Sequence, residues 1–384
     1  MAQEPDTRAE LLRQQREAKA DALESHDPNP VEQAMYVAEE RVIPLLQRDG
    51  IYARLGSLST GSGFAYGAGF RNRALVDGVG SLDLWAAGSL KKYWALEARA
   101  AYPLTPGREV VVDGHVTRYS RPTEEFFGVG PDARRRDRAA YDLDATEAGA
   151  RLAAQPIDLV RFGGGVDLLR TRASRGKHDD LPSVDDLFGP ASLTSFGETV
   201  SFTHASAFFE IDYRQPLNAR RGGWYRVDVS RFADTSDGAY TFTQTVVDLR
   251  QYVSFLAERR VLAGRAWVAT TDVDDGRQVP FYLLPALGGN DSLRGFRANR
   301  FRGRHALLLQ GEYRFEVWSA LEGALFVDAG KVALRRSDLD LRELEHDYGF
   351  GLRFNTNEGV VVRVDAAFGS RDGRHLHVVF GGIF

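Results

Sequence analysis

The 384-residue sequence contains no cysteine, which excludes a disulfide scaffold and any zinc or iron–sulfur site built on thiolate ligands. It has no run of about 18 apolar residues, so no transmembrane helix is predicted. It also lacks a basic excess, because 49 Lys and Arg face 53 Asp and Glu for a formal net charge of -4. Without a basic field or a recognisable motif, nucleic acid is not an expected partner.

Glycine and aromatic residues are abundant, with 39 Gly, 23 Phe, 14 Tyr and 5 Trp. From Gly50 onward the hydrophobic pattern has a period of two, which is typical of strands with one apolar and one polar face. In residues 305–318, one parity carries Leu307 and Leu309, while the other carries polar residues such as Glu312. One face therefore suits hydrocarbon and the other suits water.

About sixteen such runs follow one another between residues 51 and 384. Closing them into one barrel removes the exposed edges that so many strands would otherwise leave. Short turns such as residues 59–63 and 357–359 contrast with long polar segments such as residues 174–198, as expected of the two ends of an outer-membrane barrel. We therefore predict an all-β fold, a transmembrane antiparallel barrel of about 16 strands over residues 50–384, in the outer membrane of a Gram-negative-type bacterium.

Residues 1–49 follow a different pattern. A polar helix from about Pro5 to Glu24 and an amphipathic one from Val31 to Arg48 predict an N-terminal helical extension. It would lie in the periplasm, plug the lumen or lie on the membrane surface. No secretory hydrophobic segment opens the chain. This fits a mature N-terminus whose signal peptide has been removed, although a cytosolic start fits the same residues.

Two stretches carry a family resemblance: LGGNDSLRGFRANRFRGRHALLLQGEYRFEVW at residues 287–318 and EGALFVDAGKV at residues 322–332. Together they resemble the C-terminal barrel of the BamA/TamA superfamily of outer-membrane assembly and translocation proteins, the bacterial surface antigen barrel. Weaker similarity extends to residues 351–369 and to FFGVG at residues 126–130. The resemblance implies that the loop after the eleventh strand folds back into the lumen. The matching loop residues are Leu293, Arg294, Gly295 and Phe296.

In that family the loop arginine meets acidic groups on the inner wall, and Asp328 matches the family's Asp-x-Gly strand motif. Such a loop must satisfy its own backbone in a wet pore, and an arginine offers five N–H donors to wall carboxylates. The alternation of the nearby strands predicts several charged lumen partners. They are Asp328, Glu312, Glu322, Asp365, Arg353 and Arg363. The alternative is an external loop whose arginines contact lipopolysaccharide or solvent.

The two ends of the barrel sequence predict a weak seam. Gly381 and Gly382 precede the terminal Phe384 in the last strand, and Gly56 lies in the first. A seam with few hydrogen bonds would expose strand edges, and such edges template incoming strands. Alternatively, these glycines only allow the strands to curve.

The expected function is to assist folding, insertion or translocation of other polypeptides, or to perturb lipid near the seam. The alternative is a passive channel or a structural, lipid-binding barrel, including a homodimeric one. Expected partners are outer-membrane lipid, lipopolysaccharide, client outer-membrane or secreted polypeptides, and a further copy of the chain. The family places POTRA domains before the barrel, whereas only fifty residues precede Ile51, so we expect a member without them.

Catalysis, cofactors and metals are not expected, because no GxSxG, HExxH or Walker motif is present. His375 and His377 share a face of the last strand, but two ligands are too few for a metal site, and we expect them at the membrane interface. Residues 271–276 contain half of a calcium loop without its terminal Glu, which predicts a solvated turn. A barrel phospholipase would need a lipid-facing pair such as Ser230 and His204, on neighbouring predicted strands.

Overall fold

The computed structural model describes residues 48–215, 219–318, 321–356 and 359–380. The predicted N-terminal helices lie outside the described residues, so the division of the chain near residue 49 stays a prediction. Gly381, Gly382 and Phe384 also lie outside them. Among the described residues, no helix is long and apolar enough to cross a membrane.

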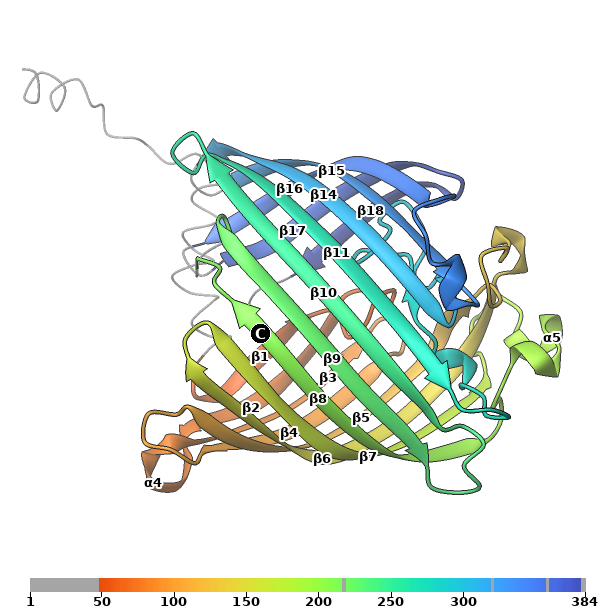
Figure 1. The fold of residues 1–384 in the computed structure, drawn as a ribbon, viewed down its shortest axis with the longest axis horizontal. Coiled ribbons are helices and arrows are strands. Elements are labelled where there is room, and N and C mark those ends of the chain that lie inside the picture. The colour runs from red at the N-terminus through yellow and green to blue at the C-terminus, as the bar shows by residue number, and fades with distance from the viewer. Residues whose placement is uncertain (1–47, 216–218, 319–320, 357–358, 381–384) are drawn as a thin grey trace, which may run out of the picture. The chain divides into compact units, whose positions relative to one another are not determined.

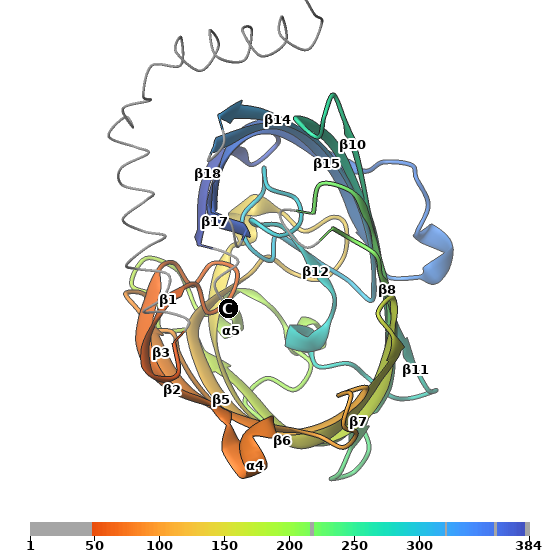
Figure 2. The ribbon, with the colours of Figure 1, turned by 90° about the vertical axis from the view of Figure 1, so that its left-hand side faces the viewer.

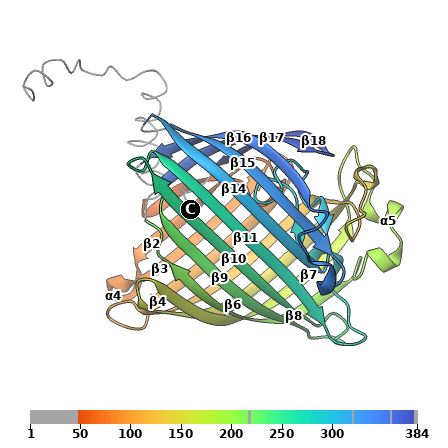
Figure 3. The same cartoon turned by 45° about the horizontal axis from the view of Figure 1, so that its top comes forward.

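Sixteen antiparallel strands form one sheet in which neighbours along the chain are neighbours in the sheet (Figures 1 and 3). The predicted fold class, a barrel of about 16 strands, is therefore confirmed. The barrel strands are β1 (Gly50–Gly56), β2 (Ala65–Ala74), β3 (Gly80–Ser89), β4 (Trp94–Pro103), β5 (Val110–Phe126), β6 (Ala139–Ile157), β7 (Val160–Arg175), β8 (Thr199–Asp212), β9 (Gly222–Asp234), β10 (Phe242–Phe255), β11 (Arg260–Val273), β14 (His305–Trp318), β15 (Leu321–Ala333), β16 (Glu345–Thr356), β17 (Gly359–Ser370) and β18 (Gly373–Phe380). Short elements lie in the connections: α4 (Leu75–Val79), η2 (Arg135–Asp137), α5 (Val184–Leu187), η3 (Pro190–Ser192), η4 (Phe281–Leu283), β12 (Ala286–Leu287), β13 (Phe301–Arg302) and η5 (Arg336–Asp338).

The alternation of side chains along each strand separates an apolar outside from a charged inside. On β15, Leu325 and Val327 are each 53% exposed, whereas Asp328, of the opposite parity, is fully buried. Cross-strand partners point to the same face of a sheet, so this parity continues from strand to strand around the ring. An exposed apolar outer surface of this kind suits the hydrocarbon of a bilayer.

The sheet begins at β1 and ends at β18, and within the described residues no ladder joins these two strands. They lie next to each other along the ring in Figure 2. Here β1 has 7 residues and β18 has 8, whereas β5 has 17 and β6 has 19. A strand needs about 9–11 residues to cross a bilayer, so β1 is short for a wall strand, whereas β18 is described only as far as Phe380.

The two ends of the barrel differ in the length of their connections. Residues 127–138, 176–198 and 274–304 connect strands at one end, where α5 lies, while α4 and the turn at residues 158–159 lie at the other (Figure 1). The turn at residues 59–63 joins β1 to β2 and so lies at the long-loop end. The expectation that this turn lies at the end with the short turns was wrong. Successive connections alternate between the two ends of an antiparallel barrel, so the order of the strands decides the end and the length of the turn does not.

The connection between β11 and β14 passes through the inside of the ring, where Figure 2 shows β12. Its first part packs on the wall of β5 and β6. The ring of Phe281 makes edge contacts with Phe126 and Tyr141, at centroid distances of 5.1 and 4.9 Å. Its second part packs on β14 and β15, where Phe296 and Phe301 belong to a buried apolar cluster. The connection therefore touches opposite parts of the wall.

The parity of β8 predicts the effect of charge on each face. Ala207 is exposed on the outer face, and its neighbour Ser206 faces the lumen. We expect Ala207→Arg to lower the free energy of unfolding in lipid vesicles by about 2–4 kcal/mol, since a charge near the bilayer midplane is poorly solvated. Ser206→Arg, the matched control, should change it by about 0.5 kcal/mol or less. Denaturant titration of both variants measures this, and equal losses would contradict the assigned parity.

Candidate functional site

Residues 288–300, between β12 and β13, form a segment that we call the arginine loop. The side chain of Arg294 is 4% exposed there. Its Nε and Nη2 donate to the two carboxylate oxygens of Asp328 on β15, each at 2.8 Å. The backbone N–H of Arg294 also donates to Asp328 Oδ2, at 3.2 Å. A bidentate, charge-assisted pair of this geometry fixes orientation as well as position.

The third nitrogen of the guanidinium is also bound. Nη1 donates to Glu312 Oε2 at 3.0 Å and lies 3.5 Å from Asp365 Oδ2. The guanidinium carbon lies 3.4 Å from the ring centroid of Phe326, a cation–π contact. Arg353 donates to Glu312 at 2.9 Å and pairs with Asp365, so a second cation shares two of the same carboxylates. The site is therefore a compact network of opposite charges.

Electrostatics keeps Arg294 charged in this network. Burial lowers the pKa of its guanidinium, but the hydrogen bond to Asp328 and the charges of Asp328, Glu312 and Asp365 raise the pKa above its ordinary value overall. Since both Arg294 and Asp328 are out of water, removing either would leave a buried charge without its partner.

Gly295 allows the loop to lie directly on the wall. A Cβ at this position would lie 2.5 Å from the Cβ of Asp347 and 3.1 Å from that of Ser370, so a larger residue would displace the loop. The hydroxyl of Ser370 donates to the carbonyl oxygen of Gly295. On either side, Leu293 and Phe296 are fully buried in the apolar cluster. Each residue of the Leu-Arg-Gly-Phe motif thus has its own contact with the wall.

The arginine loop is also bonded to both sides of the seam. His377 of β18 donates a hydrogen bond from Nε2 to the carbonyl oxygen of Arg294, at 2.7 Å. Thr60, in the turn after β1, donates from its hydroxyl to Asp291 Oδ2 at 3.2 Å. The loop therefore connects the last strand with the turn that follows the first.

The stretch at residues 126–130 lies against Arg300, at the end of the arginine loop, and against the following strand β13. The N–H of Gly130 donates to the carbonyl oxygen of Arg302 at 2.7 Å. Arg300 donates to the carbonyl oxygen of Ala133 at 2.9 Å and to Asp372 at 2.9 Å. Two segments that share a family resemblance in the sequence thus lie against each other in the fold.

Five predicted lumen partners lie around Arg294 or its loop. They are Asp328, Glu312, Asp365, Arg353 and Arg363, the last of which donates to the carbonyl oxygen of Asn290. Glu322 does not join them and pairs with Arg220. It precedes Asp328 by six residues on β15, which places it about 20 Å away along the strand.

Two expectations about other residues are corrected by the register. His377 pairs with Asp365 across β17 and β18, so it and His375 face the lumen and not the membrane interface. Ser230 and His204 also share the lumen parity, because His204 faces Phe232 across β8 and β9. A lipid-facing Ser–His pair is therefore absent at these positions. The alternation of His375 and His377 with Leu376 and Val378 could have revealed their direction in the sequence.

Comparison with known proteins identifies the family. A model of the Omp85 superfamily domain matches residues 91–382. The fold is similar to BamA from Haemophilus ducreyi lacking POTRA domains 1–3, with a TM-score of 0.64 and 14% identity over 90% of this chain and 77% of that one. It is also similar to CdiB from Escherichia coli, with a TM-score of 0.56 and 14% identity over 86% of this chain and 62% of that one, so the chain spans less than two thirds of that protein.

None of the curated protein sequences compared with the chain matches it. At 14% identity the solved structures show a shared fold, whereas the family match covers most of the sequence. The chain therefore belongs to the Omp85 superfamily and is an outer-membrane β-barrel of that family.

Proposed function

We propose that this chain assists the folding, insertion or translocation of other polypeptides at the outer membrane, and that it does so at the seam between β1 and β18. Membership of the Omp85 superfamily supports an assembly or translocation barrel. The observation that carries the proposal is that, within the described residues, no ladder joins β1 to β18. All the other neighbouring strands of the sheet are joined by hydrogen bonds.

An unpaired strand edge in a bilayer is chemically demanding. Each backbone N–H or C=O that has no partner in hydrocarbon costs several kcal/mol, at the upper end of about 2–7 kcal/mol. A client strand that pairs with β1 or β18 would satisfy these groups by β-augmentation. The seam would thus lower the barrier for a new strand to form in the membrane, because the template is already at the correct depth.

The arginine loop lies on the lumen side of this seam and contacts both sides of it. Its contacts with His377 and with Thr60 reach both sides, and the pair of Arg294 with Asp328 anchors it to β15. These contacts would hold β1 and β18 near each other without using the backbone N–H and C=O groups of their unpaired edges. The seam could then open toward a client while the rest of the wall stays intact.

A passive channel is less compatible with this interior. The connection between β11 and β14 crosses the lumen, and Phe281 packs on the wall formed by β5 and β6. A chain segment that fills part of the lumen obstructs ion flow, whereas it leaves a lateral seam accessible. Steady ion conductance without any effect on client folding would support the channel instead.

Loss of the arginine anchor should destabilise the barrel. We expect Arg294→Ala to lower the free energy of unfolding by about 3–5 kcal/mol, because Asp328 would be left as a buried carboxylate without its bidentate partner. The protein should still insert, since the wall pairing is unchanged. Denaturant titration in lipid vesicles measures the loss.

Arg297→Ala is the matched control for this experiment. Arg297 lies three residues further along the same loop and is partly exposed, so its loss should change stability by about 1 kcal/mol or less. If the two variants were equally stable, Arg294 would not anchor the loop.

Closing the seam covalently should abolish the activity. The chain has no cysteine, so cysteine pairs introduced at one position in residues 51–55 and one in residues 374–379 can be scanned for cross-linking without background. Purified protein in liposomes should accelerate folding of a test outer-membrane barrel when reduced and lose this effect when oxidised. Gel-shift kinetics of the test barrel provide the measurement.

The control pair is Ala98 and Val116, register partners on β4 and β5, whose spacing also suits a disulfide. Oxidation of this pair should leave the acceleration unchanged. Acceleration that persists after the seam is cross-linked would show that the seam is not the site, and no acceleration by the reduced protein would contradict the proposed function itself.

A further inference from the structure

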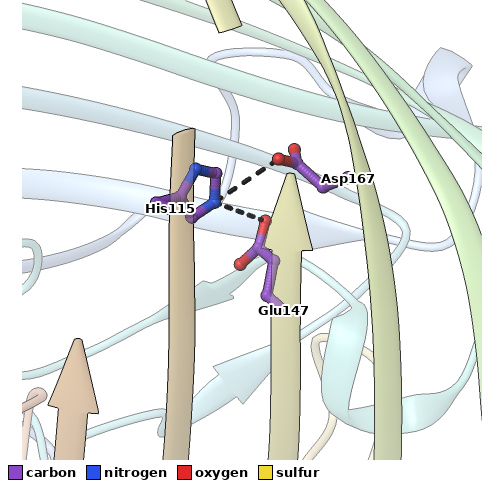
Figure 4. A group of neighbouring side chains, drawn as sticks. All are labelled: His115, Glu147 and Asp167. Carbon is purple, nitrogen blue, oxygen red and sulfur yellow. Dashed lines mark ion pairs between the residues drawn. The ribbon is translucent and has the colours of Figure 1, made fainter. Parts of the chain in front are cut away.

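A second cluster of charged and titratable side chains lies on β5, β6 and β7, away from the arginine loop. Figure 4 shows His115, Glu147 and Asp167 pointing toward one another from these three adjacent strands. His115 Nε2 lies 3.4 Å from Asp167 Oδ1 and 3.9 Å from Glu147 Oε1. One ligand atom from each residue lies within 4.8 Å of the other two.

The polar atoms of this cluster are buried and incompletely bonded. The side chain of His115 is 8% exposed and that of Asp167 is fully buried. Among the described residues, no hydrogen-bond partner is present for three of these atoms: the two ring nitrogens of His115 and Oδ1 of Asp167. Buried polar atoms in native proteins are nearly always bonded to protein, ordered water or an ion, so donor and acceptor atoms that face one another here can take a bound ion.

The register of the strands builds this space. His115 and Asp167 both face Gly149, from the two sides of β6. A Cβ at Gly149 would overlap Oδ1 of Asp167, so the glycine makes room for the carboxylate beside the imidazole. The register and the glycine therefore let the carboxylate and the imidazole face each other across β6.

The spacing and the donor types fit a metal ion. Ligands bound tetrahedrally to Zn²⁺ at about 2.0–2.2 Å lie about 3.3–3.6 Å from one another. The separation of His115 and Asp167 lies within that range, and Glu147, whose Oε1 is 3.9 Å from His115 Nε2, would have to move by about 1 Å or less to complete the set. One imidazole with two carboxylates suits borderline divalent transition metals, whereas Ca²⁺ and Mg²⁺ prefer oxygen ligands alone. We propose that His115, Glu147 and Asp167 bind one divalent transition-metal ion. Zn²⁺ is the ion used below to test the site.

Two neighbours of the cluster would tune this site. His204 lies with Nδ1 3.3 Å from Asp167 Oδ2, the oxygen that does not face His115, and its ring stacks on Phe232. Its Nδ1 also lies 3.8 Å from Glu147 Oε1, so His204 is a positioning residue that contacts both carboxylates and orients them beside the imidazole of His115. Arg151 lies 3.5 Å from Asp167 and 3.6 Å from Glu147, and 40% of its side chain is exposed. It can move into the lumen and competes with a cation for the same carboxylates.

A bound ion would tie β5, β6 and β7 together. Such a site does not exist in the unfolded chain, so metal binding adds to the stability of the folded barrel. This inference does not depend on the proposed function, because it concerns a part of the wall that is separate from the seam.

Zn²⁺ titration of the full chain tests the site. The protein is purified in detergent without a polyhistidine tag, stripped with a chelator and titrated against a fluorescent zinc indicator. One saturable ion per chain is expected. His115→Gln and Asp167→Asn should each weaken binding by more than about 100-fold, and His204→Gln by about 10–100-fold, as loss of an outer partner usually does. Arg151→Gln should strengthen binding, since it removes a competing cation.

Asp142→Asn provides the matched control. Asp142 is a carboxylate on β6 that is almost fully buried and pairs with Lys177, outside the cluster, so its loss should leave Zn²⁺ affinity unchanged. Thermal unfolding with and without Zn²⁺ gives a second readout, in which the wild-type protein gains stability and Asp167→Asn does not. Absence of saturable binding in the wild-type protein, or equal affinity in wild type, His115→Gln and Asp167→Asn, would overturn the proposal.

Discussion

The buried ion pair between the guanidinium of Arg294 and the carboxylate of Asp328 holds the arginine loop in one position inside this barrel. Because Arg294 is bound to Asp328 through two side-chain nitrogens and its own backbone N–H, the loop has one position on the wall. That position brings Gly295 against Asp347, and it brings the carbonyl oxygen of Arg294 to His377 on the last strand. The contacts on both sides of the seam follow from this single anchor.

A barrel of sixteen strands can satisfy every backbone group only if its first and last strands also pair. This chain leaves that junction without a ladder in its described residues and connects the two sides by side-chain and loop contacts inside the lumen. The hydrogen-bonded ladders that stabilise the wall therefore lie apart from the junction of β1 and β18, where no ladder forms within the described residues. The wall supplies regular hydrogen bonds and the arginine loop connects the two sides of the junction, and in the function proposed above the edges at the seam pair with a further strand.

Much of this architecture is present in the pattern of the sequence. A period of two indicates which residues face lipid, and it places Asp328 and Glu312 on the face that Arg294 reaches. The same pattern does not indicate how far along a strand a contact falls, which is why Glu322 has the correct parity and yet pairs with Arg220. Contacts such as that of Thr60 with Asp291 join segments far apart in the chain and depend on closure of the whole ring.

The cluster on β5, β6 and β7 shows the same limit more strongly. The sequence contains no metal motif, and no metal site was predicted from it. His115, Glu147 and Asp167 come together only because the register aligns His115 and Asp167 with Gly149. A register of this kind is set by turn geometry and by the burial of a whole face, and no short spacing in the sequence encodes it.

A double-mutant cycle on Arg294 and Asp328 tests the central claim most directly. The free energy of unfolding in lipid vesicles would be measured for the wild-type protein, for Arg294→Ala, for Asp328→Ala and for the double variant. If the pair anchors the loop, its two members are coupled by about 1.5–3 kcal/mol, and the double variant loses much less than the sum of the single losses. Losses that add to within about 0.5 kcal/mol would show that the two residues act independently and would contradict the account.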